Sequence, residues 1–241
     1  MTTPTTAPAW DRVPHNLQRI QRRIVDAAEA AGRDPADVRL VAVSKTFPIE
    51  ALRVALDAGQ TLFGENRVQE ALPKIDALTG SDARFHLIGH LQTNKARHGG
   101  AFDMIESVDS VRLAVALERR LPGPIPVLLE VNVAGEASKQ GFAPAELSDA
   151  LATIQPLANL QVVGLMTVAP LSVEAERARP IFAELRRLRD ANRLDEPRRG
   201  QRSMGQLSMG QLSMGMSNDF EVAIAEGATI VRIGRAIFGD R

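Results

Sequence analysis

The stretch of sequence from residue 40 to residue 66, LVAVSKTFPIEALRVALDAGQTLFGEN, predicts a strand, a helix and a second strand in succession. Its first run, LVAVS, is almost wholly apolar and rich in valine, which is typical of a buried strand. Pro48 then opens a helix over residues 49–58 that ends at Gly59, and residues 61–63 are strand-like again. Strands that alternate with helices pair in parallel, because each crossover returns the chain to the same end of the sheet.

The same alternation extends through the rest of the chain. Apolar residues at three- and four-residue steps predict an amphipathic helix over residues 13–31, closed by Gly32. Further strands are predicted at residues 85–88, 102–105, 127–133, 162–168, near Leu212, and 229–233, and further helices at residues 111–121, 144–154, 173–194 and 219–225.

Eight predicted strands in a chain of 241 residues favour a single (β/α)8 TIM-like α/β barrel, whose usual length is ~250 residues. We predict that this barrel, with an extra N-terminal helix, spans residues 10–241. The Thr- and Pro-rich residues 1–9 are predicted to be a flexible tail. A doubly wound open sheet is the alternative, but the sequence lacks the glycine-rich fingerprint with which such sheets bind dinucleotides.

The composition argues against several classes of function. Lys plus Arg and Asp plus Glu both number 29, so no excess of charge indicates a nucleic-acid or membrane partner. The chain has no Cys, which excludes disulfides, thiolate metal sites and a cysteine nucleophile. No apolar run reaches the ~20 residues that cross a bilayer, and no signal peptide is predicted. We expect a cytoplasmic protein.

Lysine is scarce in this sequence. Lys45, Lys74, Lys95 and Lys139 are the only lysines among the 29 basic residues, and the others are arginines. Lys45 follows the first predicted strand, at the C-terminal end of the barrel, where the functional residues of such barrels lie. Burial disfavours the ammonium form of a lysine and frees its amine to attack a carbonyl, which arginine cannot do. From its position alone, an ordinary surface lysine in a loop is an equally good interpretation.

Two segments near the C-terminus predict a phosphate site. In SMGMSND, Gly215 permits close approach of a ligand, and Ser217 or Asn218 is a candidate helix N-cap with free backbone N–H groups that favour an anion. In IVRIGR, Arg232 lies within an apolar run and therefore requires a partner. Barrels of this class often bind phosphate after the seventh and eighth strands. The alternatives are a plain cap, since Asn218 with Glu221 fits a capping box, and an arginine paired with a helix carboxylate.

Three further features have weaker functional interpretations. Asn66, which follows the second strand, is a candidate for the pocket, with a helix N-cap as the equal alternative. His86 and His90 share one face of a predicted strand but lack a carboxylate at ligand spacing, so structural roles are favoured over a metal site. The pentad SMGQL occurs at residues 203–207 and 208–212 and is followed by SMGMS. We interpret this repeat as local duplication in a loop, and only its third copy leads directly into a helix.

Seven segments of the chain, in order, resemble the pyridoxal phosphate homeostasis protein family, also described as alanine racemase N-terminal-domain-like proteins that bind pyridoxal 5'-phosphate (PLP). They run from about residue 40 to the C-terminus: VAVSKTFP, FGENRVQE, FHLIGHLQTNKA, LLEVNVAGEASKQGF, GLMTVAP, LSMGMSNDFEVAIAEGAT and VRIGRAIFG. The resemblance implies a barrel that holds PLP as a Schiff base on Lys45. It also implies that the phosphate is held by Ser213, Gly215, Met216, Ser217, Arg232, Ile233 and Gly234. The extra SMGQL copies depart from the family pattern.

The resemblance also implies a role in keeping intracellular PLP and amino-acid pools in balance, with no settled catalytic reaction. We therefore expect a PLP carrier that supplies apoenzymes and that is a monomer or a weak dimer. An amino-acid racemase is the alternative, but related racemases use a tyrosine base from an added β-domain, and this chain contains no Tyr. A third possibility is a phosphate-binding or phosphosugar barrel enzyme in which Lys45 has no special role.

Overall fold

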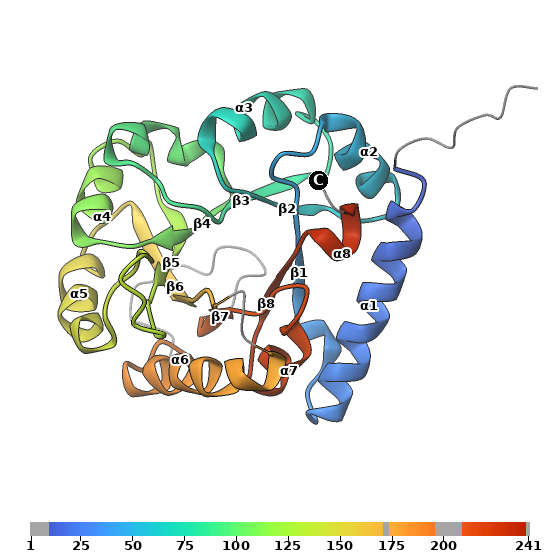
Figure 1. Ribbon diagram of the computed structural model, residues 1–241. Helices are drawn as coiled ribbons and strands as arrows, with labels where there is room; N and C mark the ends of the chain where they lie inside the picture. Colours follow the sequence, from blue (N-terminus) through green and yellow to red (C-terminus); the bar gives the residue numbers. More distant parts are fainter. Residues whose placement is uncertain (1–9, 171–173, 196–208, 240–241) are drawn as a thin grey trace, which may run out of the picture.

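The computed structural model describes residues 10–170, 174–195 and 209–239 (Figure 1). Eight parallel strands form a closed barrel in which each strand pairs with the next along the chain and β8 pairs with β1. The predicted (β/α)8 barrel is thereby confirmed. The predicted tail at residues 1–9, the first copy of SMGQL and Ser208 of the second copy lie outside the described residues.

The strands agree with their predicted positions to within a few residues. Even the strand predicted near Leu212 is present, although it is only three residues long. The strand predicted over residues 127–133 ends at Glu130, because Asn132 turns away and its N–H donates to the carbonyl of Phe142. The strands are β1 (Arg39–Val43), β2 (Leu62–Glu65), β3 (Arg84–Leu87), β4 (Met104–Val108), β5 (Ile125–Glu130), β6 (Leu160–Met166), β7 (Gln211–Ser213) and β8 (Ile230–Ile233).

Helices surround the barrel, and several of them were not predicted. The helix α3 contains Pro73, which removes a backbone donor and obscures the helical pattern, and α8 has only four residues. The α-helices are α1 (Val13–Ala30), α2 (Ile49–Asp57), α3 (Val68–Ala77), α4 (Val111–Glu118), α5 (Leu147–Ile154), α6 (Arg179–Ala191), α7 (Phe220–Ala225) and α8 (Arg235–Phe238). The 3-10 helices are η1 (Pro35–Asp37), η2 (Thr93–Ala101), η3 (Pro144–Glu146) and η4 (Ala175–Ala178).

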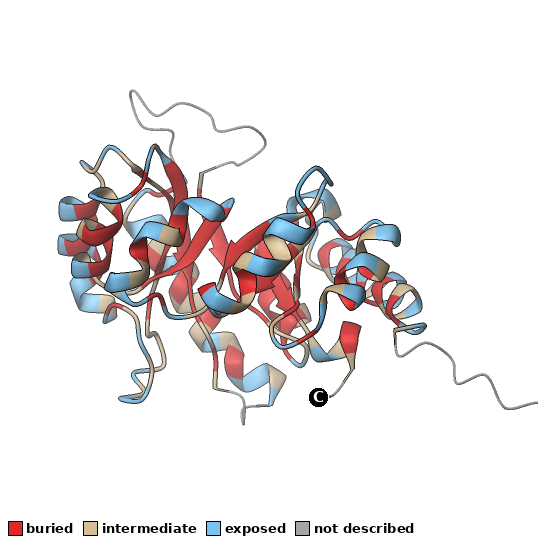
Figure 2. Ribbon diagram, turned by 90° about the horizontal axis from the view of Figure 1, so that it is seen from above, coloured by how far each residue is buried: buried red, intermediate tan, exposed pale blue. Residues whose placement is uncertain are grey.

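The core has two layers, one on each side of the barrel wall. Figure 2 shows the buried strands at the centre and helices whose outer faces are exposed. The larger layer packs the strands against the helices and contains the fully buried Phe63, Phe182 and Phe220. The smaller layer fills part of the barrel interior and consists of Val41, Met104, Leu128, Val163, Met166 and Ile230.

The extra N-terminal helix α1 packs against elements from the far end of the chain. It contacts α7, α8 and α2 (Figure 1). The Asn16 side chain donates to the carbonyl of Ile237 at 2.9 Å, and Nε of Arg23 donates to Glu221 at 2.7 Å. Its buried face consists of Val13, Leu17, Ile20, Ile24 and Ala28, which confirms the predicted apolar stripe.

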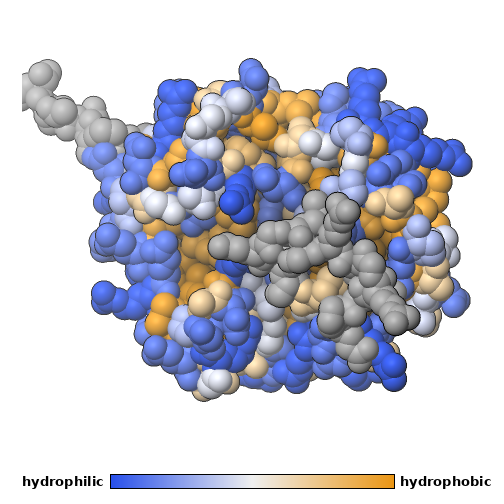
Figure 3. Space-filling model, turned by 180° about the vertical axis from the view of Figure 1, so that it is seen from behind, coloured by the Kyte–Doolittle hydropathy of each residue, from blue (hydrophilic) through white to orange (hydrophobic). Residues whose placement is uncertain are grey.

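One face of the molecule shows how polar and apolar residues are distributed on its surface. Seen from behind, hydrophilic residues dominate the margin of the molecule, and hydrophobic residues lie between them (Figure 3). No helix in the described part of the chain combines the length and the apolar character that a membrane span requires.

Candidate functional site

The carboxyl ends of β7, β8 and β1 bring the predicted site residues to one end of the barrel. β1 pairs with β8 up to Ile233, so Lys45 and Gly234 both extend just beyond the paired region. The backbone N–H of Arg232 donates to the carbonyl of Gly215 at 3.0 Å, which continues the contact between β7 and β8 past the end of β7. Lys45 itself is half-buried. The turn after β7, the turn after β8 and the lysine after β1 are therefore neighbours.

The turn after β7 presents free backbone N–H groups. Gly215 has a φ of +91°, and a Cβ atom there would lie 2.6 Å from a side chain of α7, so this position requires glycine. The N–H of Met216 is used locally, since it donates to Oδ1 of Asp219 at 2.6 Å. No hydrogen bond among the described residues engages the N–H groups of Ser217 and Asn218.

The turn after β8 has the same property. The backbone N–H groups of Gly234 and Arg235 make no hydrogen bond within the described chain. At Gly234 a Cβ atom would lie 3.1 Å from the carbonyl oxygen of Val43, so a side chain would press against β1. Two adjacent turns thus each present a pair of free N–H groups, an arrangement that favours an anion such as a phosphate group.

The predicted helix caps at these turns are wrong. The N-cap of α7 is Asp219 and not Ser217 or Asn218, because a tight turn joins the N–H of Asp219 to the carbonyl of Met216 before the helix begins. The capping box of Asn218 is therefore not formed. The N-cap of α3 is Arg67, so the cap interpretation of Asn66 is also wrong.

Asn66 instead lies at the carboxyl end of β2, next to the end of β1. The N–H of Ser44 donates to the carbonyl of Gly64 at 3.0 Å, which fixes the two strand ends side by side. Asn66 is half-buried, and Gly89 packs against its backbone so closely that a Cβ atom would lie 2.5 Å from the Asn66 carbonyl oxygen. The side chain thus belongs to the same end of the barrel as Lys45.

Arg232 is part of a buried polar chain inside the barrel. Its Nη1 donates to Oγ of Ser213 at 2.5 Å, and its Nη2 donates to the carbonyl of Thr167 at 2.8 Å. Ser213 in turn donates to Oε2 of Glu106 at 2.5 Å, and Oε1 of Glu106 lies 2.5 Å from Nδ1 of His86. The hydrogen-bond partners of Arg232 therefore come from the barrel interior and not from a helix. The Ser213 hydroxyl is already engaged on both sides, which leaves it no proton to donate to a ligand.

The charges in this chain shift one another's pKa values. Burial opposes ionisation of Glu106, but the hydrogen bond and charge of His86, the charge of Arg232 and the Ser213 hydroxyl outweigh burial and lower the pKa of this carboxyl. Burial lowers the pKa of Arg232, against the charges of Glu106, Glu130 and Asp219. Glu130 ends β5 on the same side of the barrel. Burial, with Asp109, raises its pKa to about 7, although Arg232 opposes the shift.

A second buried charge pair lies beside the end of β1. Nζ of Lys74, on α3, donates to Oε1 of Glu65 at 2.7 Å and to the carbonyl of Ser44 at 2.9 Å. The Ser44 hydroxyl donates to the same carboxylate oxygen at 2.7 Å. Lys74 is therefore committed to a structural ion pair within the barrel wall. Of the two lysines near this strand end, Lys45 is the better candidate for chemistry.

Glu106, Thr167 and Glu130 were not predicted from the sequence. Glu106 had a usable signal, because a carboxylate within the apolar strand MIESV requires a partner as much as Arg232 does. Thr167 contributes only its backbone carbonyl, and the pKa of Glu130 is shifted by residues that lie on other parts of the chain. Nothing in the sequence around either residue indicates these roles. Within the described residues, no group of three or more His, Asp or Glu side chains is arranged to hold a metal ion.

Known proteins match this chain over almost its whole length. Residues 14–241 match the family described as alanine racemase, N-terminal domain. A pyridoxal phosphate homeostasis protein from Aquifex aeolicus is 43% identical over 229 residues, which cover 93% of this chain and 96% of that protein.

Two solved structures extend the comparison. PipY from Synechococcus elongatus, determined with PLP bound, has a TM-score of 0.75 and 40% identity, over 91% of this chain and 100% of that chain. Alanine racemase from Corynebacterium glutamicum has a TM-score of 0.67 at 18% identity, over 95% of this chain and 60% of that chain. The likeness to the racemase concerns the fold alone.

Proposed function

Because the chain belongs to the pyridoxal phosphate homeostasis protein family, we propose that it binds PLP as a Schiff base on Lys45 and acts in intracellular PLP homeostasis without catalysing a reaction. The observation that carries this proposal is the pair of turns after β7 and β8, whose four free N–H groups lie beside the strand end that bears Lys45. PLP supplies an aldehyde, which a lysine amine can bind covalently, and a phosphate, which free N–H groups can hold.

The predicted contact residues divide into three roles under this proposal. The backbone of Gly215, Met216, Ile233 and Gly234 shapes the two turns, and Ser217 adds a hydroxyl at the first of them. Arg232 supplies a fixed positive charge beneath the turns, and Ser213 holds that charge in place through its 2.5 Å hydrogen bond. Asn66 borders the pocket from β2.

The first experiment tests the lysine. Purified protein should absorb near the boundary of the visible and ultraviolet ranges, and borohydride should fix the cofactor to the peptide that contains Lys45. Lys45→Ala should abolish the reducible chromophore, whereas Lys95→Ala, in the connection between β3 and β4, should retain it. A label on Lys74, Lys95 or Lys139, or an unchanged chromophore in Lys45→Ala, would refute the assignment.

The absence of catalysis rests on the chemistry of the site. Racemisation requires acid and base groups on both faces of the substrate α-carbon, and the chain has no tyrosine to serve as the second base. General acid–base catalysis by a positioned group contributes typically ~10²–10⁴-fold, so any proton exchange should be far slower than ordinary enzyme turnover. Cytoplasmic location, a monomeric or weakly dimeric state and transfer of PLP to apoenzymes complete the proposal.

The second experiment separates a carrier from a racemase. Holo-protein is incubated with each L-amino acid in deuterated water, and both α-deuteration and D-isomer formation are followed. In parallel, the transfer of PLP from the holo-protein to an apoenzyme is measured. We expect transfer without robust turnover. Turnover that Lys45→Ala abolishes, with the cofactor retained throughout, would establish the racemase instead.

A further inference from the structure

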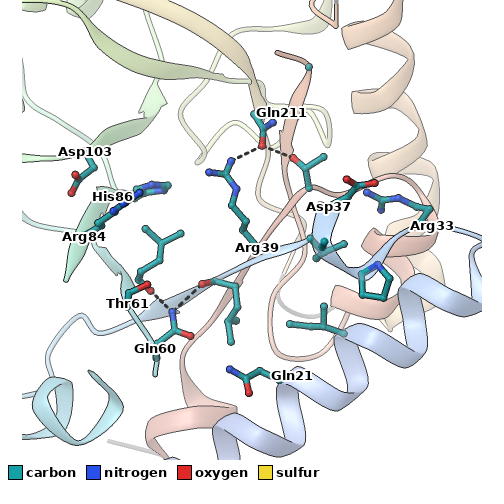
Figure 4. Close-up of a pocket in the computed structure, with 18 of the residues that line it drawn as sticks. Gln21, Arg33, Asp37, Arg39, Gln60, Thr61, Arg84, His86, Asp103 and Gln211 are labelled. Carbon is teal, nitrogen blue, oxygen red and sulfur yellow. Dashed lines mark hydrogen bonds between the residues drawn. The ribbon is translucent and has the colours of Figure 1, made fainter. Parts of the chain in front are cut away.

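A large cavity lies at the opposite end of the barrel from Lys45. It encloses about 1210 Å³ where the N-terminal ends of β1, β2, β3 and β7 meet η1, and its polar lining includes Arg39, Gln60, Arg84, His86 and Gln211 (Figure 4). This volume exceeds the ~300–1,000 Å³ of ordinary small-molecule sites. The N-terminal face of such a barrel commonly serves stability, so a cavity with this lining requires an explanation.

His86 reaches this cavity with an unused ring nitrogen. The residue is only 4% exposed, and its Nδ1 is held by Glu106 at 2.5 Å. Its Nε2 has no hydrogen-bond partner among the described residues. Figure 4 shows the imidazole and the guanidinium of Arg39 pointing toward one another across the cavity. This nitrogen is not among the fully buried atoms that lack a partner, so it faces the open space of the cavity and is available to a bound group.

Arg39, which also lines the cavity, has no carboxylate partner among the described residues. Its Nη2 donates to Oε1 of Gln211 at 2.6 Å, which is a neutral acceptor, and no described carboxylate forms an ion pair with it. Burial lowers its pKa, with the charge of Glu106 acting in the opposite direction. Arg84 on β3 also has no ion-pair partner in the described part of the chain, but it is exposed, so it adds a solvated cation to the cavity. A partly buried cation without a carboxylate is poorly compensated, and a bound anion would remove the deficit.

The remaining charges of the cavity lie nearer its rim. Arg33 is engaged with two backbone carbonyls at 2.8 Å, and Arg189 forms an ion pair with Asp190. The lining carboxylates Asp37 and Asp103 are exposed. Asp103 is moreover engaged at 2.7 Å by the N–H of Phe85. The third lining carboxylate, Asp195, is exposed as well, so the half-buried Arg39 is the innermost charge of the lining, with the buried Glu106 behind His86.

We propose that this cavity binds a small phosphorylated metabolite, whose phosphate contacts Arg39, Arg84 and Nε2 of His86. The three groups come from β1 and β3, on either side of β2, so they approach an anion from different directions. This suits a tetrahedral phosphate better than a planar carboxylate. Gln60 and Gln211 line the space beside it, where the Gln60 amide donates to the carbonyls of Leu40 and Leu62 and the Gln211 oxygen accepts from Arg39.

The test follows the ring resonances of the four histidines by NMR while inorganic phosphate, and then glycerol phosphate, is added to the full chain at constant ionic strength. The signal of His86 should move in a saturable manner, whereas those of His15 and His98 should not. Arg39→Gln should weaken binding roughly ten- to a hundredfold, in line with the loss of a hydrogen bond to a charged group. Arg53→Gln, an exposed arginine on α2, is the matched control and should change nothing.

Several outcomes would overturn the proposal. It fails if His86 does not respond to either phosphate compound, or if malonate moves its signal and phosphate does not. It also fails if binding survives in both Arg39→Gln and Arg84→Gln. Should Arg39→Gln unfold, Arg39→Lys keeps the charge, and Arg84→Gln still tests the contact. His86 is linked to the turns near Lys45 through Glu106, Ser213 and Arg232, so the titration is repeated in Ser217→Ala. Unchanged phosphate binding in this variant assigns the anion to the N-terminal cavity, and loss of binding would overturn the proposal.

Discussion

At the scale of single residues, Arg232 is a cation that is fixed inside the barrel. The guanidinium of Arg232 is held on one side by Ser213 and on the other by the carbonyl of Thr167, so it cannot swing toward solvent. In the low dielectric of a barrel interior, a cation fixed in this way acts strongly on groups at the nearby strand ends. The half-buried Lys45, at the end of β1, is the group that chemistry would use there.

Replacing Arg232 should weaken retention of PLP. Its guanidinium donates to Ser213 and Thr167, so it acts on the phosphate as a nearby fixed charge. Removal of this charge in Arg232→Gln should cost roughly ten- to a hundredfold in affinity, about 1.4–2.7 kcal/mol, measured by equilibrium dialysis. Ser217→Ala should also weaken retention, while Ser208→Ala should not, because only the third pentad leads into α7. Unchanged affinity in Arg232→Gln, or the reverse order of the two serine variants, would contradict the assignment.

Glu130 should make stability depend on pH. Its pKa is raised from 4.5 to about 7 in the folded protein, so between these values the folded state retains a proton that the unfolded state loses. The free energy of unfolding should therefore fall as the pH rises from about 4.5 to about 7. At about 1.36 kcal/mol per pKa unit, the decrease is at most roughly 3 kcal/mol.

Glu130→Gln keeps the side chain neutral and should remove this dependence. In urea unfolding of the apo-protein, the variant and the wild type should have similar free energies of unfolding near pH 5. Near pH 8 the free energy of unfolding of the variant should be higher. Glu29→Gln, an exposed carboxylate on α1, is the control. A difference between Glu130→Gln and wild type that is the same at both pH values would show that Glu130 is not the titrating group.

At the scale of elements, the ion pair between β2 and α3 shows how a barrel wall accommodates charge. Glu65 is fully buried and Lys74 is 11% exposed, and Oε2 of Glu65 has no hydrogen-bond partner in the described part of the chain. Burial raises the pKa of Glu65 despite the hydrogen bonds from Lys74 and Ser44. The helix therefore contributes to the site by holding the end of β1 through the carbonyl of Ser44.

Removing Lys74 alone should be costly. Lys74→Met leaves a buried carboxylate without its cation, and breaking such a pair typically costs about 3–5 kcal/mol. The double variant Glu65→Gln with Lys74→Met should recover much of this loss, since no unpaired charge remains. Urea unfolding of both variants makes the comparison. If the double variant were as unstable as the single one, lost packing rather than unpaired charge would be the cause.

The elements were predictable from sequence to very different degrees. All eight strands were found because their apolar runs are short and lie between helices, and β7 was found despite its three residues. The helix α3 was missed because Pro73 lies inside it, and the start of α7 was misplaced because the turn at Met216 resembles a cap. Lys45 could be proposed because the apolar strand directly before it is visible in the sequence. The series of hydrogen bonds from His86 to Arg232 could not be predicted, since Glu106 and Ser213 are 107 positions apart in sequence.

At the scale of the whole molecule, the buried polar chain joins the two ends of the barrel. His86 borders the N-terminal cavity, Arg232 lies beneath the turns near Lys45, and Glu106 connects them through Ser213. Each link is a short hydrogen bond between buried groups, and such links influence one another in a low dielectric. A change at Glu106 should therefore alter the surroundings of both His86 and Arg232.

Glu106→Gln tests this connection. The neutral amide cannot compensate the buried cation of Arg232, so the variant should lose about 3–5 kcal/mol of stability, measured by urea unfolding. It should also shift the ring resonance of His86 and weaken PLP retention. Glu118, at the end of α4, is a carboxylate outside this series of hydrogen bonds. Glu118→Gln should therefore leave the His86 resonance and the retention of PLP unchanged. A shifted His86 signal with normal PLP retention would show that the two ends are independent.

The position of α1 has a consequence for how the protein is made. This helix is synthesised long before two of its partners, α7 and α8, and the contact between Asn16 and Ile237 spans 221 positions. Until then the apolar face of α1 lacks these partners, and β1 lacks its neighbour β8. Contacts between such distant positions form slowly, because long loops must close first. The nascent chain should therefore remain protease-sensitive until α7 and α8 have emerged from the ribosome, and it should become resistant in one step after that.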